Sequence, residues 1–211
     1  RSTLLSESIV IIDYNIGNLR SVQKSFEKND CDAIITNNHE KILNADKIVL
    51  PGVGSFRDGM NGLLNLGLVE ILNESIINNK KPFLGICLGM QLMANRSYEN
   101  IETKGLGWID SEIVKFEFNS TTKDLKIPHV GWNGVTFKED CQLYKGIPNE
   151  SDFYFVHSYH YSLNENVATG ITDYGYQFTS SIQKNNLFGF QFHPEKSQKF
   201  GLKIINNFIA L

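Results

Sequence analysis

The sequence predicts an α/β protein with a mostly parallel, doubly wound sheet, followed by an antiparallel or mixed extension. Two observations support this. In the first half, apolar runs of strand length alternate with segments of helical periodicity, whereas after about Gly105 short alternating segments dominate. At 211 residues, without repeats or a linker, the chain suits one well-buried domain. We expect this domain at 9–211 and an extension at 1–8, either disordered or added during cloning.

The elements of the first half follow from short apolar runs, which are typical of strands covered on both faces. The strands are expected at 9–12, 33–36, 48–50 and 82–86. Leu19, Val22 and Phe26 are spaced as on one face of a helix, and a helix is expected at 88–94. One long helix is expected to bury a single stripe, formed by Met60, Leu63, Leu64, Leu68, Ile71, Leu72 and Ile76.

The second half contains predicted strands separated by turn residues and a last helix. The strands of the extension are expected at 112–118, 152–156, 179–182 and 187–192. A final helix at 198–210 is expected to bury Phe200, Ile204, Ile205, Phe208 and Ile209.

The composition argues against several classes of protein. A formal net charge of −3 without a basic tract predicts no binding to nucleic acid or to an anionic membrane. The apolar runs are much shorter than a membrane span. Three cysteines without CxxC or paired Cys/His spacing predict neither a disulfide framework nor a zinc site, and therefore a reducing, cytoplasmic compartment. The sequence has no phosphate-binding loop, metal constellation or dinucleotide fingerprint, so we expect no cofactor and no metal.

Residues 85–89, Gly-Ile-Cys-Leu-Gly, form the most informative motif. The motif lies between a predicted strand and a predicted helix, as in the nucleophile elbow, where a sharp turn raises the nucleophile above the sheet. Small flanking residues let the strand and helix backbones approach closely, and a helix N-terminus favours the reactive thiolate. The alternative is that Cys87 is a small buried hydrophobe, as most free cysteines are. Cys31 and Cys141 have no comparable setting and are interpreted as structural.

A cysteine that cleaves an amide needs a proton donor for the leaving amine, usually histidine. Of five histidines, His193 ends an apolar run and is followed by Pro194 and Glu195. Residues i and i+2 of an extended segment share a side, so the carboxylate of Glu195 is expected beside the imidazole, where it would orient it. The alternative is a histidine at a strand end with an incidental acidic neighbour.

Six motifs together resemble the class I, triad-type glutamine amidotransferases over almost the whole chain. Within that family they look most like the glutaminase subunit of imidazole glycerol phosphate synthase. In chain order the motifs are IDYNIGNLRS, LPGVGSF, GICLGMQLM, KIPHVGWN, FYFVHSY and QFHPEKSQ. The resemblance implies a flavodoxin-like three-layer fold and the hydrolysis of L-glutamine to glutamate and ammonia.

The resemblance also implies roles for individual residues. Cys87 would be the nucleophile that forms a γ-glutamyl thioester, His193 the acid and base, and Glu195 the residue that orients it. The backbone amides of Val53, in a PGVG turn, and Leu88 would bind the oxyanion. The residues implied to bind the substrate are Gly52, Gln91, His157, Ser158 and Tyr159. Without the resemblance, PGVG is an ordinary turn after a strand.

A partner follows from the same resemblance. Free ammonia becomes ammonium in neutral water and is no longer a nucleophile, so such subunits dock on a (β/α)₈-barrel synthase as a heterodimer. Asn15, Trp132 and Lys196 match positions that face the barrel. The alternatives are a core aromatic for Trp132 and a solvated charge for Lys196.

Three functions remain open at this stage. One is the histidine-biosynthesis role, and a second is a related subunit that supplies ammonia for amidinating nucleotide-linked sugars of surface polysaccharides. His160, where a second tyrosine is more usual, is one departure that bears on this choice. A stand-alone cysteine hydrolase would share the elbow but would not be expected to carry PHVGWN or Lys196.

Overall fold

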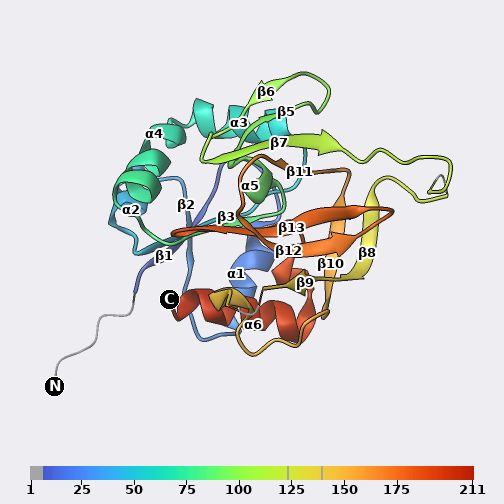
Figure 1. Cartoon of the computed structure of the whole chain (residues 1–211). Helices are drawn as coiled ribbons and strands as arrows, with labels where there is room; N and C mark the ends of the chain where they lie inside the picture. The colour runs from blue at the N-terminus through green and yellow to red at the C-terminus, as the bar shows by residue number, and fades with distance from the viewer. Residues whose placement is uncertain (1–6, 123, 139) are drawn as a thin grey trace.

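The structure, a computed structural model, describes residues 7–122, 124–138 and 140–211 (Figure 1). Residues 1–6 of the predicted extension lie outside the described residues. Its last two residues are bonded to the domain: Ser8 N–H donates to the Asp46 carboxylate at 2.7 Å, and Glu7 pairs with the buried ammonium of Lys47.

Five parallel strands form the centre of the main sheet in the order β2-β1-β3-β4-β14, the flavodoxin-like order. Their bounds are β1 Ile9–Ile12, β2 Ile34–Thr36, β3 Lys47–Leu50, β4 Phe83–Ile86 and β14 Leu187–Phe190. The prediction of a mostly parallel centre is confirmed. The sequence placed 187–192 in the extension, but β14 pairs in parallel with β4, because a turn at Asn185 and Asn186 returns the chain to the middle of the sheet.

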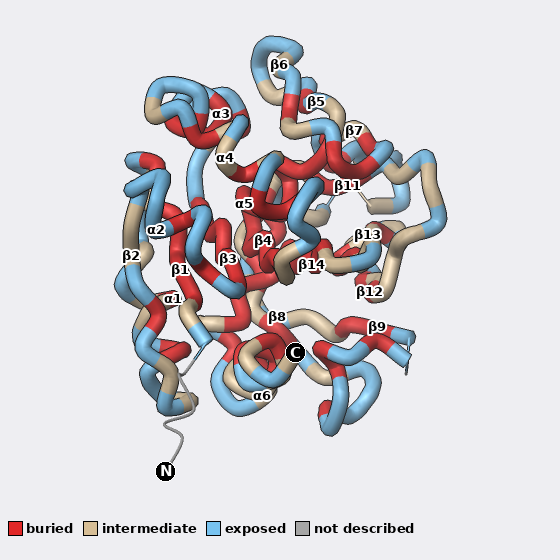
Figure 2. The backbone as a smooth tube through the Cα atoms, turned by 90° about the vertical axis from the view of Figure 1, so that its left-hand side faces the viewer, coloured by how far each residue is buried: buried red, intermediate tan, exposed pale blue. Residues whose placement is uncertain are grey.

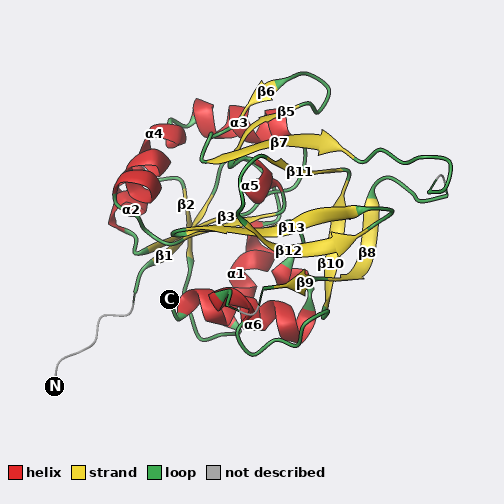
Figure 3. Cartoon of the chain, in the orientation of Figure 1, coloured by secondary structure: helices red, strands yellow, loops and turns green. Residues whose placement is uncertain are grey.

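Helices cover both faces of this sheet, giving the expected three layers (Figures 1 and 3). Ile9 and Ile11 pack in the same core as α1 (Leu19–Glu27) and α6 (Gln198–Ile209). Val10 and Ile12 point to the opposite face and pack in a second core. That core is covered by α2 His39–Asn44, α3 Phe56–Asn65, α4 Leu68–Leu72 and α5 Leu88–Gln91. Figure 2 shows the central strands buried between these layers.

The long helix expected from the apolar stripe is wrong as a single element. It is divided at Gly67, whose φ of 64° lies in the left-handed region, and α4 continues into a π-helical turn at Asn73–Asn78. Because the axis changes there, Leu64 is 59% exposed instead of buried. Apart from Leu64, the apolar period identified residues on the covered side of each piece, but it could not show where the helix was divided.

The helix expected at 88–94 is also shorter than predicted. Helix α5 ends at Gln91, and strand β5 begins at Ala94. The carbonyls of Leu92, Met93 and Ala94 accept backbone hydrogen bonds from residues 106–108 instead of from a further helical turn. A distant segment therefore ends the helix.

The rest of the sheet is mixed, as the alternating segments predicted. Most neighbours in this part are antiparallel, but β5 and β7 are parallel. The strands are β5 Ala94–Ser97, β6 Thr103–Lys104, β7 Ile109–Lys115, β9 Thr136–Phe137, β11 Tyr159–Leu163, β12 Ala168–Asp173 and β13 Gln177–Lys184. A separate antiparallel pair consists of β8 (His129–Gly134) and β10 (Asp152–His157). Two 3-10 turns lie at Gln142–Tyr144 and Pro194–Lys196.

None of the helices in the described ranges is long and apolar enough to cross a lipid bilayer. All three cysteines are free, in agreement with the prediction that they form no disulfide framework.

Candidate active site

The candidate residues meet at one edge of the central sheet. Asn15 follows β1, Val53 follows β3, Cys87 follows β4 and His193 follows β14. These strands are parallel, so their carboxyl ends lie at the same edge. In open α/β sheets, ligands bind at this edge.

Cys87 occupies a sharp elbow between β4 and α5, as the sequence predicted. Its φ of 54° and ψ of −110° are unusual for a residue with a side chain. A Cβ on Gly89 would lie 1.7 Å from the Leu50 carbonyl oxygen, and one on Gly85 would lie 2.9 Å from the Gly89 backbone. Both glycines are therefore required by the approach of the turn to the neighbouring strands.

His193 and Glu195 form a buried pair. His193 Nδ1 lies 2.7 Å from Glu195 Oε1, and the two side chains are 2% and 3% exposed. The predicted proximity is confirmed, although Glu195 belongs to the 3-10 turn 194–196 and not to an extended segment. Among the described residues, His193 Nε2 and Glu195 Oε2 have no hydrogen-bond partner, so both atoms are free to bind a reacting group or water.

The charge state of His193 depends on Cys87. Burial by itself lowers the pKa of His193. The negative charge of the Cys87 thiolate and the Glu195 carboxylate outweigh burial and raise the pKa of His193 to about 10. When Cys87 is the thiolate, the imidazole of His193 is therefore protonated at neutral pH and can donate a proton.

A pocket of about 350 Å³ opens onto Cys87, within the usual size range for small-molecule sites. The structure brings most of the predicted substrate and oxyanion residues to its wall. The pocket is lined by Val53, Gly54, Cys87, Leu88, Gln91, Glu99, Val156, His157, Ser158 and Tyr159.

Gly52 does not line this pocket and has a different role. Its Cα packs against the buried hydroxyl of Tyr14, where a Cβ would lie 2.1 Å from that oxygen. Tyr14 in turn donates to the Pro51 carbonyl, and burial, followed by the charge of Cys87, raises the pKa of its hydroxyl. The tyrosine therefore stays neutral and holds the loop after β3 in place.

The two predicted oxyanion donors do not converge. The Gly52 carbonyl accepts a hydrogen bond from Leu88 N–H at 3.2 Å. Because a trans peptide is planar, the Val53 N–H points opposite to the Gly52 carbonyl and therefore away from Leu88. Rotation of the Gly52–Val53 peptide would free the Leu88 N–H and redirect that of Val53.

Two residues of the site were missed from the sequence. Glu99, in the loop between β5 and β6, lines the pocket while accepting the Phe56 N–H at 3.0 Å. No local pattern distinguished it from other surface acids. Gln191 is fully buried and lies 3.7 Å through Nε2 from Cys87 Sγ. Its position two residues before His193 was a signal that could have been used.

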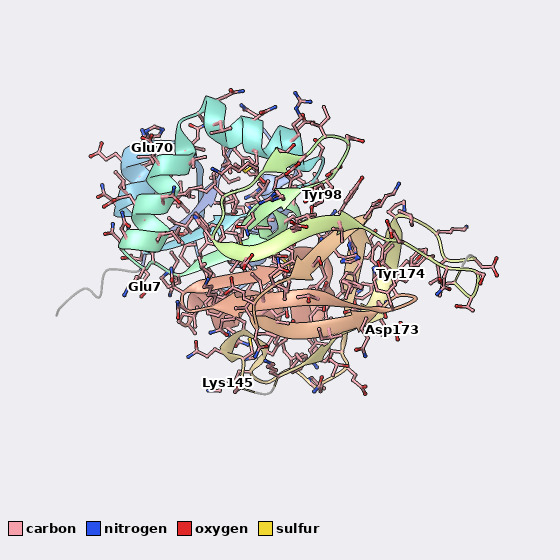
Figure 4. The ribbon with its side chains drawn as sticks, turned by 45° about the horizontal axis from the view of Figure 1, so that its top comes forward. Glu7, Glu70, Tyr98, Lys145, Asp173 and Tyr174 are labelled. Atoms are coloured by element: carbon pink, nitrogen blue, oxygen red, sulfur yellow. The ribbon has the colours of Figure 1, made fainter. Side chains whose placement is uncertain are left out.

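A chain of hydrogen bonds runs behind the pocket wall. His157 Nδ1 donates to the Tyr159 carbonyl at 2.9 Å, so its Nε2 accepts from His129 Nδ1 at 2.8 Å. His129 Nε2 then accepts from Asn133 at 3.2 Å. The ring of Tyr174, which Figure 4 places in the turn after β12, stacks on His129 with a 4.1 Å centroid separation. Both histidines are therefore neutral, with fixed tautomers.

This chain predicts loss of stability in acid. Burial lowers the pKa of His157 to about 3 and that of His129 to about 4, whereas an unfolded histidine titrates near 6.5. Below that pH the unfolded chain binds more protons, so the free energy of unfolding should fall by several kcal/mol as the pH drops toward 4, at about 1.4 kcal/mol per pKa unit. The raised pKa of His193 does not offset this, because its contribution is constant below 6.5.

Urea unfolding at several pH values between 6.5 and 4 tests this expectation. The variant His129→Gln/His157→Gln should lose less stability over this range than the wild type, and His39→Gln, at an exposed site, should follow the wild type. Equal slopes in the wild type and the double variant would contradict the assignment.

His160, the departure noted in the sequence, is a structural residue. Its Nε2 lies 2.7 Å from the Tyr176 hydroxyl and its Nδ1 lies 2.9 Å from the Tyr161 carbonyl. It does not line the pocket.

The three residues predicted to face a partner are all exposed. Trp132 is 49% exposed and points to the same side of β8 as Val130, which is 56% exposed, so the interpretation of Trp132 as a core aromatic is wrong. Asn15 and Lys196 are also exposed, and both follow strand ends at the edge that carries the pocket.

The sequence matches the family model described as glutamine amidotransferase class-I over residues 10–211. The chain belongs to this family of enzymes, in which a flavodoxin-like sheet carries the site at its carboxyl edge.

Curated relatives narrow the comparison. The chain is 52% identical over 204 residues to "Imidazole glycerol phosphate synthase subunit HisH" of Methanocaldococcus jannaschii, covering 96% of this chain and 99% of the relative. It is 49% identical over 203 residues to "Imidazole glycerol phosphate synthase subunit HisH 1" of Campylobacter jejuni, covering 96% and 100%. A solved chain of PurLQS from Thermotoga maritima shares the fold, with a TM-score of 0.73, 15% identity, and coverage of 98% and 99%.

Proposed function

We propose that the chain hydrolyses L-glutamine to glutamate and ammonia as the glutaminase subunit of imidazole glycerol phosphate synthase, in histidine biosynthesis. The observation that carries the proposal is Cys87 on a strained elbow, open to a pocket and coupled to the buried His193–Glu195 pair. The full-length similarity to relatives of that name supports the choice of pathway.

In the proposed reaction the Cys87 thiolate attacks the side-chain carbonyl carbon of glutamine. The resulting tetrahedral oxyanion collapses as the His193 imidazolium gives its proton to the leaving nitrogen, which departs as ammonia and leaves a γ-glutamyl thioester. Neutral His193 then takes a proton from water, the hydroxide attacks the thioester, and glutamate and the thiolate are released with the imidazolium restored. Glu195 orients the ring and stabilises its charge throughout.

The pocket suits the amino-acid end of glutamine. Glu99 places a carboxylate in its wall, which is the chemistry needed to bind an α-ammonium group. Gln91 uses its Nε2 hydrogens on Tyr159 and Gln191, so its carbonyl oxygen is available as a further acceptor. We propose that these two residues bind glutamine beside His157, Ser158 and Tyr159.

We further propose that the subunit is at rest until a partner docks. The Leu88 N–H is occupied by the Gly52 carbonyl and the Val53 N–H points away from it, so an oxyanion would meet neither of its two donors. Rotation of the Gly52–Val53 peptide would complete the pair. The partner is a (β/α)₈-barrel cyclase, forming a heterodimer with the exposed edge that carries Trp132.

The test of this function is glutamate release, measured with the subunit alone and with the histidine-pathway cyclase of its own organism. We expect the cyclase to raise the rate by about 10²-fold or more, because one oxyanion donor is typically worth ~10²–10³ in rate. The measurement is a coupled glutamate assay at saturating glutamine.

Two controls separate docking from chemistry. Trp132→Ala should weaken the stimulation while leaving the slow rate of the isolated subunit unchanged, whereas Cys87→Ala should abolish both rates. Full activity without the cyclase would contradict the resting state. Activity that ignores this cyclase would favour a sugar-amidinating partner.

A further inference from the structure

Within the described part of the chain, Gln191 is a buried polar side chain that contacts the nucleophile but is not used in the proposed reaction. It follows β14 directly, is fully buried, and does not line the pocket. Its backbone N–H donates to the Ser180 carbonyl at 2.9 Å, which ties it to the neighbouring strand. A buried amide held so firmly against a reactive sulfur requires an explanation.

The hydrogen bonds around Gln191 set the direction of its amide. The Tyr159 carbonyl can only accept, so Gln91 must turn its Nε2 toward it, at 3.2 Å. The second hydrogen of that Nε2 then reaches Gln191 Oε1 at 3.1 Å. Gln191 therefore presents its own Nε2 to Cys87 Sγ at 3.7 Å. Which atom of the Gln191 amide is nitrogen and which is oxygen is therefore assigned from these hydrogen bonds and not from the shape of the amide.

A donor at this position favours one form of the nucleophile. An N–H directed at sulfur is stabilising for the thiolate, which accepts strongly, and much less so for the thiol. The Val156 carbonyl oxygen, 3.9 Å from Sγ, can interact only with the thiol. Gln191 thus stabilises the thiolate, whereas Val156 favours the thiol, and the contact with Gln191 also limits where Sγ can lie.

We propose that Gln191 is a positioning residue that holds Cys87 Sγ as the thiolate and links it, through Gln91, to the pocket that receives the amino-acid end of the substrate. This inference rests on the proposed glutaminase function for the identity of the substrate. The effect of Gln191 on Cys87 Sγ depends only on the contacts seen in the isolated subunit.

The experiment is alkylation of Cys87 by iodoacetamide as a function of pH, measured on the isolated subunit, with the modified cysteine identified by peptide mass spectrometry. Gln191→Glu keeps the shape and the acceptor for Gln91 and, as the carboxylate, has no donor for Sγ, and Gln191→Met removes the amide while keeping the volume. Both should alkylate about 10-fold or more slowly at neutral pH, with the half-maximal rate displaced to higher pH, because a hydrogen bond to a charged group is lost.

Gln183→Met is the matched control, because Gln183 contacts Cys141, the other buried cysteine, at 3.6 Å. It should leave Cys87 alkylation unchanged. A wild-type pH profile in folded Gln191→Glu or Gln191→Met would overturn the proposal. Melting curves identify any variant that does not fold. One replacement is polar and the other apolar, so the site can accept one of them even if the other prevents folding.

Turnover separates this inference from the function on which it rests. In the complex with the cyclase, Gln191→Met should lower kcat for glutamine by roughly 10-fold or more while KM changes little. A shifted alkylation profile in a protein that never hydrolyses glutamine would reject the proposed function and keep the role of Gln191. Normal alkylation together with reduced kcat would reject the role at the sulfur.

Discussion

Replacing Cys87 by alanine should lower cyclase-stimulated glutamine hydrolysis by roughly 10⁴-fold or more, the scale seen when a triad nucleophile is removed. The reason is that Cys87 supplies the thiol of the pocket: neither Cys31 nor Cys141 lines it. The fold should survive, because alanine keeps the Cβ that the elbow already accommodates. A glutamate assay with purified variant, and circular dichroism for the fold, measure both effects.

A second variant, Cys87→Gly, separates the backbone strain at this position from the role of the thiol in the reaction. Cys87→Gly should be as inactive as Cys87→Ala, yet more stable than it by about 1 kcal/mol. A φ of 54° with ψ of −110° costs a residue with a side chain ~1–3 kcal/mol, and the extra freedom of glycine in the unfolded chain offsets part of the gain. Urea unfolding of the two variants compares them directly. An alanine variant as stable as glycine would mean that the elbow stores no strain, and activity in either variant would reject Cys87 as the nucleophile.

Gly89→Ala has the largest expected effect on stability. The added methyl would lie 1.7 Å from the Leu50 carbonyl oxygen, a backbone atom of the central strand β3 that cannot move without breaking the sheet. We expect a loss of about 4 kcal/mol or more, the range in which single substitutions prevent folding. Any variant that folds should have a displaced elbow and little activity. Urea unfolding and the glutamate assay provide the two measurements.

Gly17→Ala is the matched control for this substitution. Its Cβ would meet no atom within 4 Å, and its φ is outside the left-handed region, so the change should stay within about 0.5 kcal/mol. A stable and active Gly89→Ala would show that β3 and the elbow are further apart than described.

The sequence by itself determined the features that depend on neighbouring residues. Strand β1 has the predicted bounds, and strands β3 and β4 and helix α6 begin and end within a residue or so of the predicted ranges. Each is a short apolar run or an apolar stripe whose period shows in a few residues. The elbow at Cys87 and the pairing of His193 with Glu195 were predictable for the same reason, since each is contained within five residues.

Only the tertiary structure decided the features that depend on distant segments. Strand β14 enters the centre of the sheet beside β4, helix α5 ends where residues 106–108 take its carbonyls, and the stripe around Leu64 is divided at Gly67. The first two outcomes depend on partners outside the local sequence, and the third on a backbone angle at Gly67 that the apolar period does not contain.

The site follows the same division. The nucleophile and its base lie in local motifs, but the occupied Leu88 N–H and the contact between Gln191 and Cys87 join segments from different strands. Whether an N–H is free or a thiolate has a donor depends on distances of a few ångströms across the sheet edge. Those distances are set by packing and strand pairing, because a hydrogen bond is gained or lost within less than 1 Å.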